Sequence, residues 1–244
     1  MKQIISIFLL LIIIDGLTSC KNEEPMTTCL GYSFITSYLK GANQDTVFGI
    51  GFSTVTNKIF SSVEVVHSVS QATYTLAAIE NHANNFGYET PFEDMTGSLP
   101  EIGKYLFSYT LTNNESLNST DSVTSDVLYP AIIDTCYYNK NVGHVELKWE
   151  PVTNANYIHV FLKNNAGKRV FATKNALTGT STSTNISETT NGWIVDYVPN
   201  ANETYIVEII AFRYKKGSTN SVRDGIQARS VATETVAWGT KIQI

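Results

Sequence analysis

ETYIVEIIAFRY, at residues 203–214, is the clearest strand pattern in the chain. Its side chains alternate between two faces, and one apolar face is made by Tyr205, Val207, Ile209 and Ala211. The other face carries Ile206, Glu208 and Ile210. A period of two is typical of a β-strand, and from residue 30 onward it dominates over helical periodicity. The sequence therefore predicts an all-β fold.

Shorter strand patterns precede this stretch. Residues 144–149 (HVELKW) and 157–163 (YIHVFLK) alternate in the same way. Together with 203–214 they resemble a fibronectin type III domain over residues 128–244. The residues that carry the resemblance are Trp149 in the core of the second strand, Pro151 and Tyr157 after it, and Pro199 with Tyr205 as the tyrosine of the corner. Residues 178–191 lack a hydrophobic pattern, and we expect a long polar loop or a weak edge strand there.

The N-terminal half carries a weaker version of the same pattern. Pro100 precedes Tyr105 by five residues, as Pro199 precedes Tyr205 by six. We therefore expect two tandem immunoglobulin-like β-sandwiches at residues 30–121 and 128–244, with a boundary in the polar stretch 113–126. A single larger sandwich with a long loop is the alternative.

The first residues are typical of an export leader. An apolar run at residues 4–14 is too short for a membrane span, which needs about 20 residues. Leu17-Thr18-Ser19-Cys20 resembles the bacterial lipobox, which implies a signal peptide at 1–19 and an acylated Cys20. The alternative is an ordinary signal peptide followed by an unrelated cysteine. Acyl chains would hold the protein on a membrane.

Residues 20–29 are expected to form a lipidated tether. Lys21-Asn22-Glu23-Glu24 resembles the surface-export signal of Bacteroidota lipoproteins, which implies an outer-membrane protein that faces the cell exterior. A plain polar tether is the alternative. If Cys20 is acylated, Cys29 and Cys136 remain, and outside the cytoplasm they can pair. The sequence leaves open whether they do.

Composition excludes one class of partner. The chain has 244 residues and a formal net charge of −5. Nucleic-acid binding needs a basic surface, so we expect no nucleic-acid partner. No HExxH, GxSxG or CxxC motif is present, and the histidines are spread along the chain. We therefore expect no enzyme activity, no cofactor and no metal site.

The segment 84–95 (NNFGYETPFEDM) is the strongest candidate for a binding loop. It places aromatic rings beside carboxylates, which are the usual parts of a surface binding site. The candidate ligand-binding residues are Phe86, Tyr88, Glu89, Phe92, Glu93 and Asp94. In the alternative, Phe86 and Phe92 pack into the base of the sandwich while the acids lie in water.

The expected function is recognition without chemistry. The leader, the acidic tether and the tandem sandwiches resemble the accessory lipoproteins of starch-utilisation-type nutrient import systems. That resemblance implies a polysaccharide or peptide ligand and an outer-membrane transporter complex as partners, and it is an analogy at the level of fold. A structural or adhesive module of a cell-surface complex is the alternative.

Overall fold

The chain folds almost entirely into β-structure. A computed structural model describes residues 28–41, 44–79, 82–218 and 225–239. Within these ranges the chain forms fifteen strands and one 3₁₀ turn, η1 (Phe92–Asp94). The predicted all-β fold is confirmed. The predicted leader at 1–19 and Cys20 lie outside the described residues, as does most of the tether.

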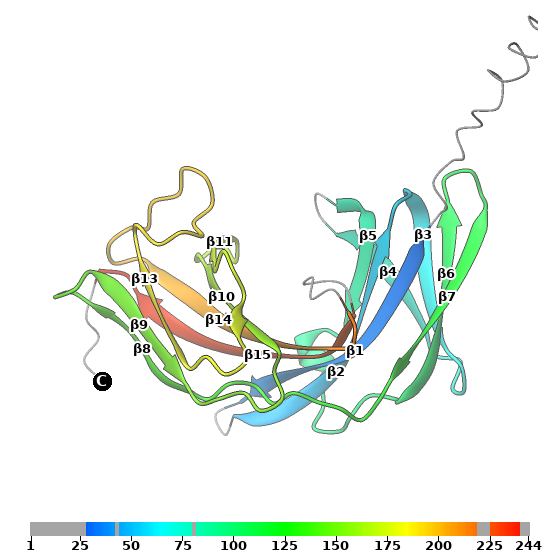
Figure 1. The fold of residues 1–244 in the computed structure, drawn as a ribbon, viewed down its shortest axis with the longest axis horizontal. Coiled ribbons are helices and arrows are strands. Elements are labelled where there is room, and N and C mark those ends of the chain that lie inside the picture. Colours follow the sequence, from blue (N-terminus) through cyan, green and yellow to red (C-terminus); the bar gives the residue numbers. More distant parts are fainter. Residues whose placement is uncertain (1–27, 42–43, 80–81, 219–224, 240–244) are drawn as a thin grey trace, which may run out of the picture.

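The C-terminal half is a two-layer sandwich (Figure 1). Its strands are β8 (Ile133–Asn139), β9 (His144–Trp149), β10 (Tyr157–Lys163), β11 (Arg169–Ala172), β12 (Leu177–Thr178), β13 (Ser183–Ser187), β14 (Thr204–Tyr214) and β15 (Ile226–Ala237). A three-stranded sheet in the order β13-β9-β8 packs on the β11-β10-β14-β15 sheet. The polar stretch 178–191 thus provides an edge strand, β13, which was one of the two expectations.

Two residues of the fibronectin type III pattern lie where the sequence places them. Trp149 is buried in the core between the two sheets. The hydroxyl of Tyr205 accepts a hydrogen bond from the Asn200 backbone N–H at 3.1 Å, and it donates to Glu203 Oε2 at 2.8 Å. Tyr205 therefore forms the predicted corner. In the N-terminal half, the Tyr105 hydroxyl donates to the Glu101 carbonyl at 2.7 Å, so both halves carry a buried corner tyrosine.

The N-terminal half is one strongly curled sheet. Its strands are β1 (Cys29–Lys40), β2 (Asp45–Thr56), β3 (Phe60–His67), β4 (Thr73–Ile79), β5 (His82–Glu89), β6 (Gly103–Leu111) and β7 (Ser116–Val123). The order is β1-β2-β5-β4-β3-β6-β7, and the curl brings β7 back against β1. There the backbone N–H groups of Gly31 and Ser33 donate to Ser119 Oγ at 3.2 Å and Asp121 Oδ2 at 2.7 Å. An aromatic core fills the interior.

The polar stretch 113–126 is a strand rather than a boundary loop for most of its length. Residues 116–123 form β7, which pairs with β6 along its whole length. Residues 116–123 therefore belong to the N-terminal half, where the polar side chains of Ser119 and Asp121 accept hydrogen bonds from the backbone of β1. A hydroxyl- and carboxylate-rich strand can close a sheet in this way.

The two halves share one continuous sheet. β1 pairs in parallel with β15, from Ile35 opposite Ala228 to Tyr38 opposite Val231. The result is a twelve-stranded sheet, and Figure 1 shows the two halves rising as arms from the β15-β1-β2 floor. Side-chain contacts reinforce the junction: Lys215 pairs with Asp121, and Gln227 donates to Asp126 at 2.6 Å. The relative position of the arms is therefore fixed by the sheet itself.

Candidate functional site

A cleft of about 420 Å³ lies between the two arms. Its walls come from β1, β2, β4 and β5 on one side and from β10, β11, β14 and β15 on the other. The lining residues are Phe34, Phe52, Ser53, Ala77, Ala78, Ile79, Gly87, Tyr88, Glu89, Phe161, Arg169, Ile210, Phe212, Ile226 and Arg229. A mostly apolar cleft with a few convergent polar groups is the usual form of a ligand site.

The cleft floor is apolar because β14 is apolar on both faces. Val207, Ile209 and Ala211 point into the C-terminal sandwich core. Ile210 and Phe212 point the other way, where a lone sandwich would meet water. They form a third core cluster with Tyr214 of the same strand and with residues of β1, β10 and β15, namely Phe34, Phe161, Ile226 and Val231. The second face of β14 is thus used to join the two halves and to line the cleft.

A partly buried ion pair crosses the cleft. The Arg229 guanidinium on β15 donates to the Glu89 carboxylate on β5. Glu89 Oε1 also accepts from the Tyr38 hydroxyl at 3.0 Å and from Thr36 Oγ1 at 3.1 Å. Burial raises the pKa of Tyr38 to about 12. Burial alone would lower the pKa of Arg229, but the charges and hydrogen bonds of Glu89 and Tyr38 together outweigh burial, and the pKa is raised. Arg229 therefore stays charged at neutral pH.

A second cation lies flat on an aromatic ring at the cleft wall. The guanidinium carbon of Arg169 is 4.0 Å from the centroid of Phe161. Arg169 Nη2 lies 3.5 Å from Glu208 Oε2, while Lys163 Nζ reaches Glu208 Oε1 at 2.6 Å. Stacking on the ring fixes the plane of the guanidinium. Half of the Arg169 side chain, 51%, stays exposed.

The predicted binding loop is divided among three places. Phe86 is buried in the N-terminal core, and Tyr88 packs against the Phe52 and Tyr74 rings at 6.0 and 5.2 Å. The segment is largely a strand, β5, so Glu89 points to the opposite side from Phe86. Of the six predicted residues, Tyr88 and Glu89 line the cleft.

The other three predicted residues lie on η1. The ring of Phe92 meets Tyr38 edge-on at 5.6 Å, and Lys40 Nζ lies 5.4 Å from its centroid. Glu93 and Asp94 are exposed. The idea that all six residues form one surface was wrong, because the alternation of β5 separates them. The alternative, in which Phe86 and Phe92 pack into the base of the sandwich, is correct for Phe86. Phe92, in contrast, is 44% exposed.

The two described cysteines do not pair. Cys29 on β1 packs against the N-terminal core and Cys136 on β8 against the C-terminal core, and both thiols are free. The disulfide that the sequence left open is therefore not formed. Burial raises the pKa of Cys136 to about 12 and also raises that of Cys29.

One cluster has the residue types of a hydrolase but not the geometry. His67 Nδ1 lies 2.9 Å from Ser70 Oγ and 3.1 Å from Glu101 Oε2, and Nε2 lies 3.3 Å from the Ile102 carbonyl. In a catalytic triad the acid binds the ring nitrogen that faces away from the nucleophile. Here serine and acid share one nitrogen, so the acid cannot orient the ring for proton transfer.

Two further kinds of feature are absent from the described part of the chain. In residues 28–41, 44–79, 82–218 and 225–239, no three His, Cys, Asp or Glu side chains group as metal ligands. Within the same residues, no helix has the length and apolar character to cross a membrane.

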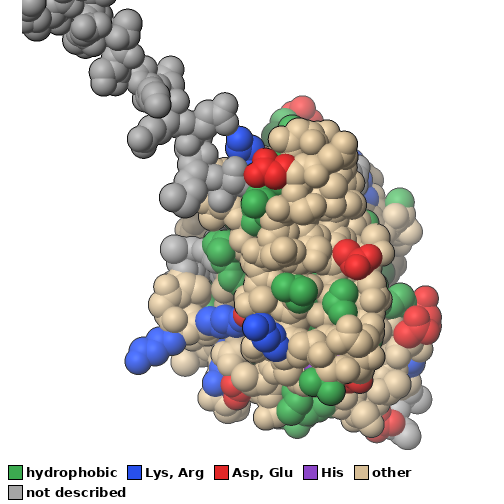
Figure 2. Space-filling model, turned by 90° about the vertical axis from the view of Figure 1, so that its right-hand side faces the viewer, with side chains coloured by type: hydrophobic (Ala, Val, Ile, Leu, Met, Phe, Trp, Pro, Cys, Tyr) green, Lys and Arg blue, Asp and Glu red, His purple; other side chains and the backbone are tan. Residues whose placement is uncertain are grey.

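On the face of the N-terminal arm seen in Figure 2, the described residues form no apolar patch. Figure 2 shows this face with its hydrophobic side chains in separate spots among uncharged polar atoms. Scattered apolar residues of this kind are normal on a protein surface. The cleft is therefore a more concentrated apolar site than this face.

Fold and site together define an all-β protein with a fibronectin type III-like C-terminal half and a cleft between two joined halves. No family model matches the chain, and no curated protein matches it. The fold is similar to the FN1–FN3 domains of chicken CNTN1, at 9% identity over 78% of this chain and 63% of that chain, with a TM-score of 0.29. It is also similar to the fibronectin(III)-like modules of Clostridium thermocellum CbhA, at 9% identity over 78% of this chain and 85% of theirs, with a TM-score of 0.26. The fold assignment itself rests on the strand order, Trp149 and Tyr205.

Proposed function

We propose that this chain is a surface-anchored, non-catalytic lipoprotein that binds a ligand in the cleft between its arms. The observation that carries the proposal is the shared lining of that cleft, since aromatic side chains from both halves converge there around the Glu89–Arg229 pair. A rigid scaffold that presents a preformed apolar cleft is suited to recognition. The leader and the Cys20 lipobox support anchoring in the outer membrane.

The ligand in this proposal is a polysaccharide or a peptide, held near an outer-membrane nutrient importer. The cleft volume of about 420 Å³ falls in the lower part of the range of roughly 300–1,000 Å³ for ligand sites. It therefore accommodates a short segment of a chain rather than a folded domain. An anchored protein of this kind keeps a polymeric ligand close to the membrane.

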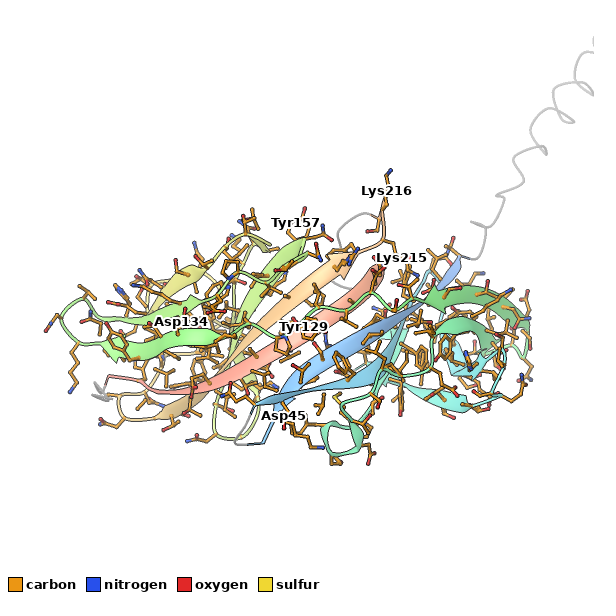
Figure 3. The ribbon with its side chains drawn as sticks, turned by 90° about the horizontal axis from the view of Figure 1, so that it is seen from below. Asp45, Tyr129, Asp134, Tyr157, Lys215 and Lys216 are labelled. Atoms are coloured by element: carbon orange, nitrogen blue, oxygen red, sulfur yellow. The ribbon has the colours of Figure 1, made fainter. Side chains whose placement is uncertain are left out.

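A second candidate function has its own observation. Tyr129 and Ile132 are 62% and 53% exposed and line a smaller hollow of about 170 Å³ with Pro151. Figure 3 places Tyr129 on the underside of the shared sheet, away from the arms. Exposed apolar residues around a hollow are typical of protein contacts. This surface supports a structural or adhesive module of a surface complex.

A binding screen that includes a variant with a blocked cleft distinguishes the two candidate functions. Every described strand lies between Cys29 and Ala237, so a protein that starts at residue 21 keeps the described fold. It is screened against glycans, peptides and purified importer. Ala77→Trp fills the cleft from an exposed small residue on the same face of the sheet as Glu89, and Ala176→Trp adds the same ring at an exposed position outside the cleft. Binding lost in Ala77→Trp alone supports the cleft, whereas binding lost only in Tyr129→Ala supports the second candidate.

A further inference from the structure

One cation of the cleft shares its carboxylate partner with a second cation. Among the described residues that line it, the cations are Arg169 and Arg229. Arg229 is neutralised by its contact with Glu89. The carboxylate beside Arg169 is Glu208, but Lys163 takes that carboxylate at 2.6 Å while Arg169 stays at 3.5 Å. Two cations share one carboxylate there, so the Arg169 side of the cleft has a surplus positive charge.

The position of Arg169 suits a planar anion. A guanidinium carries five N–H donors, and the structure engages one of them, with Glu208. Its face is covered by Phe161 at 4.0 Å, so the donors at its edge are held in a fixed plane. Such an edge binds a carboxylate through two parallel hydrogen bonds. The anion is therefore recognised by geometry as well as by charge.

Apart from Glu208 and Lys163, the cleft side chains near Arg169 are apolar. Phe161, Ile210 and Phe212 lie on the same side of the cleft, and Phe34 and Ile226 complete its lining. A ligand bound here must present an apolar group directly beside its carboxylate. Hydroxyl groups buried against these side chains would lose their hydrogen bonds to water without replacement.

We propose that the ligand is a peptide segment in which an acidic residue lies next to a large apolar side chain. The carboxylate of the peptide binds the edge of the Arg169 guanidinium, and its apolar side chain fills the cleft between Phe161 and Phe34. Few polar groups line the cleft beside the two arginines, namely Ser53, Tyr88 and Glu89, and this favours a peptide over a hydroxyl-rich saccharide. The inference rests on the proposed function, because it names the ligand of the same cleft.

Selection from a displayed library of short random peptides tests this directly. Wild-type protein should enrich sequences with Asp or Glu adjacent to Phe, Leu, Ile or Trp. A synthetic peptide from that set should bind about tenfold more weakly when its acid is replaced by the amide, since a charge-assisted hydrogen bond is lost. Arg169→Ala should weaken the acidic peptide by a similar factor, and Arg169→Lys, which keeps the charge, by less.

Lys168→Ala is the matched control. It removes the same charge one residue away on an exposed side chain that does not line the cleft, so affinity should stay unchanged. Enriched peptides without acids, or equal affinity in Arg169→Ala, would overturn the inference. Binding of neutral oligosaccharides in place of peptides, lost in Ala77→Trp, would overturn it while the proposed cleft function stands. Binding that Ala77→Trp leaves intact for every probe contradicts the proposed function itself.

Discussion

Arg229 and Glu89 are 140 positions apart in the chain, yet the guanidinium of one donates to the carboxylate of the other across the joint between the two halves. Arg229 Nη2 also donates to the Tyr38 hydroxyl at 3.0 Å. Three strands, β15, β5 and β1, therefore meet in one polar network at the bottom of the cleft. The same contacts that hold the arms together give the site its buried charges.

Breaking this pair should destabilise the protein. Arg229 and Glu89 are 18% and 30% exposed, so either partner left alone is a partly buried charge without its counter-ion. Glu89→Gln or Arg229→Ala is expected to lower the free energy of unfolding by about 2 kcal/mol. Urea unfolding measures this, with the exposed Glu64→Gln as a control that changes stability by less than about 0.5 kcal/mol. Additive effects in the double mutant would show that the two residues are not coupled.

The corner tyrosine of the C-terminal half should contribute through its hydroxyl. Tyr205→Phe removes the acceptor of the Asn200 N–H and leaves that group without its side-chain partner. We expect a loss of about 1–3 kcal/mol in thermal or urea unfolding. Tyr129→Phe removes a hydroxyl from an exposed ring and serves as the control. Equal stability of the two variants would argue against a structural corner.

The sequence predicted individual elements better than it predicted their assembly. Trp149 and Tyr205 have local signals, because each belongs to an alternating strand with a turn residue nearby. The parallel pairing of Ile35–Tyr38 with Ala228–Val231 has no such signal, since strands from opposite ends of the chain meet there. One hint was present: Ile206 and Ile210 make the second face of β14 apolar, which a lone half-exposed sheet does not need.

The candidate site shows the same limit. Alternation along residues 86–89 separates Phe86 from Glu89, and this signal was available in the sequence. Arg169 and Arg229 belong to strands that only the fold brings near β5. Neither arginine has a recognisable binding motif around it, so no pattern in the sequence indicates that it belongs to a site.

Glycines at two strand contacts should tolerate no side chain. A Cβ on Gly31 would overlap the ring of Phe107, and a Cβ on Gly51 would overlap the ring of Phe34. We expect Gly31→Ala and Gly51→Ala to cost about 1–3 kcal/mol in the free energy of unfolding, because the rings must move. Gly97→Ala is the control, since no atom lies within 4 Å of its Cβ position. A destabilised Gly97→Ala with stable strand variants would contradict the packing described.

Labelling with a thiol reagent tests whether Cys29 and Cys136 are unpaired. In protein that starts at residue 21, Cys29 and Cys136 should both react with a thiol reagent after unfolding without reductant. In the folded protein Cys136 should react slowly, because its pKa of about 12 leaves little thiolate at neutral pH. This raised pKa favours the folded state below about pH 9, and that contribution is lost as the pH rises toward 12. If unfolded protein that has not been reduced shows no reactive thiols, Cys29 and Cys136 form a disulfide.

The anchor has a direct chemical test. Full-length protein expressed in a bacterial host that processes lipoproteins should carry acyl groups on Cys20 and fractionate with membranes. Cys20→Ser should abolish both, as measured by intact mass and by fractionation. Cys29→Ser is the matched control and should change neither. Soluble wild-type protein without acyl mass would contradict the surface-anchor proposal.

Hydrogen–deuterium exchange with the selected peptide bound tests whether the two halves of the chain together form one binding site. We expect simultaneous protection in β4 and β5 of one arm and in β10, β11 and β14 of the other, and loss of that protection in Ala77→Trp. Protection confined to one half, or to the segment around Tyr129 on the opposite side of the sheet, would contradict it.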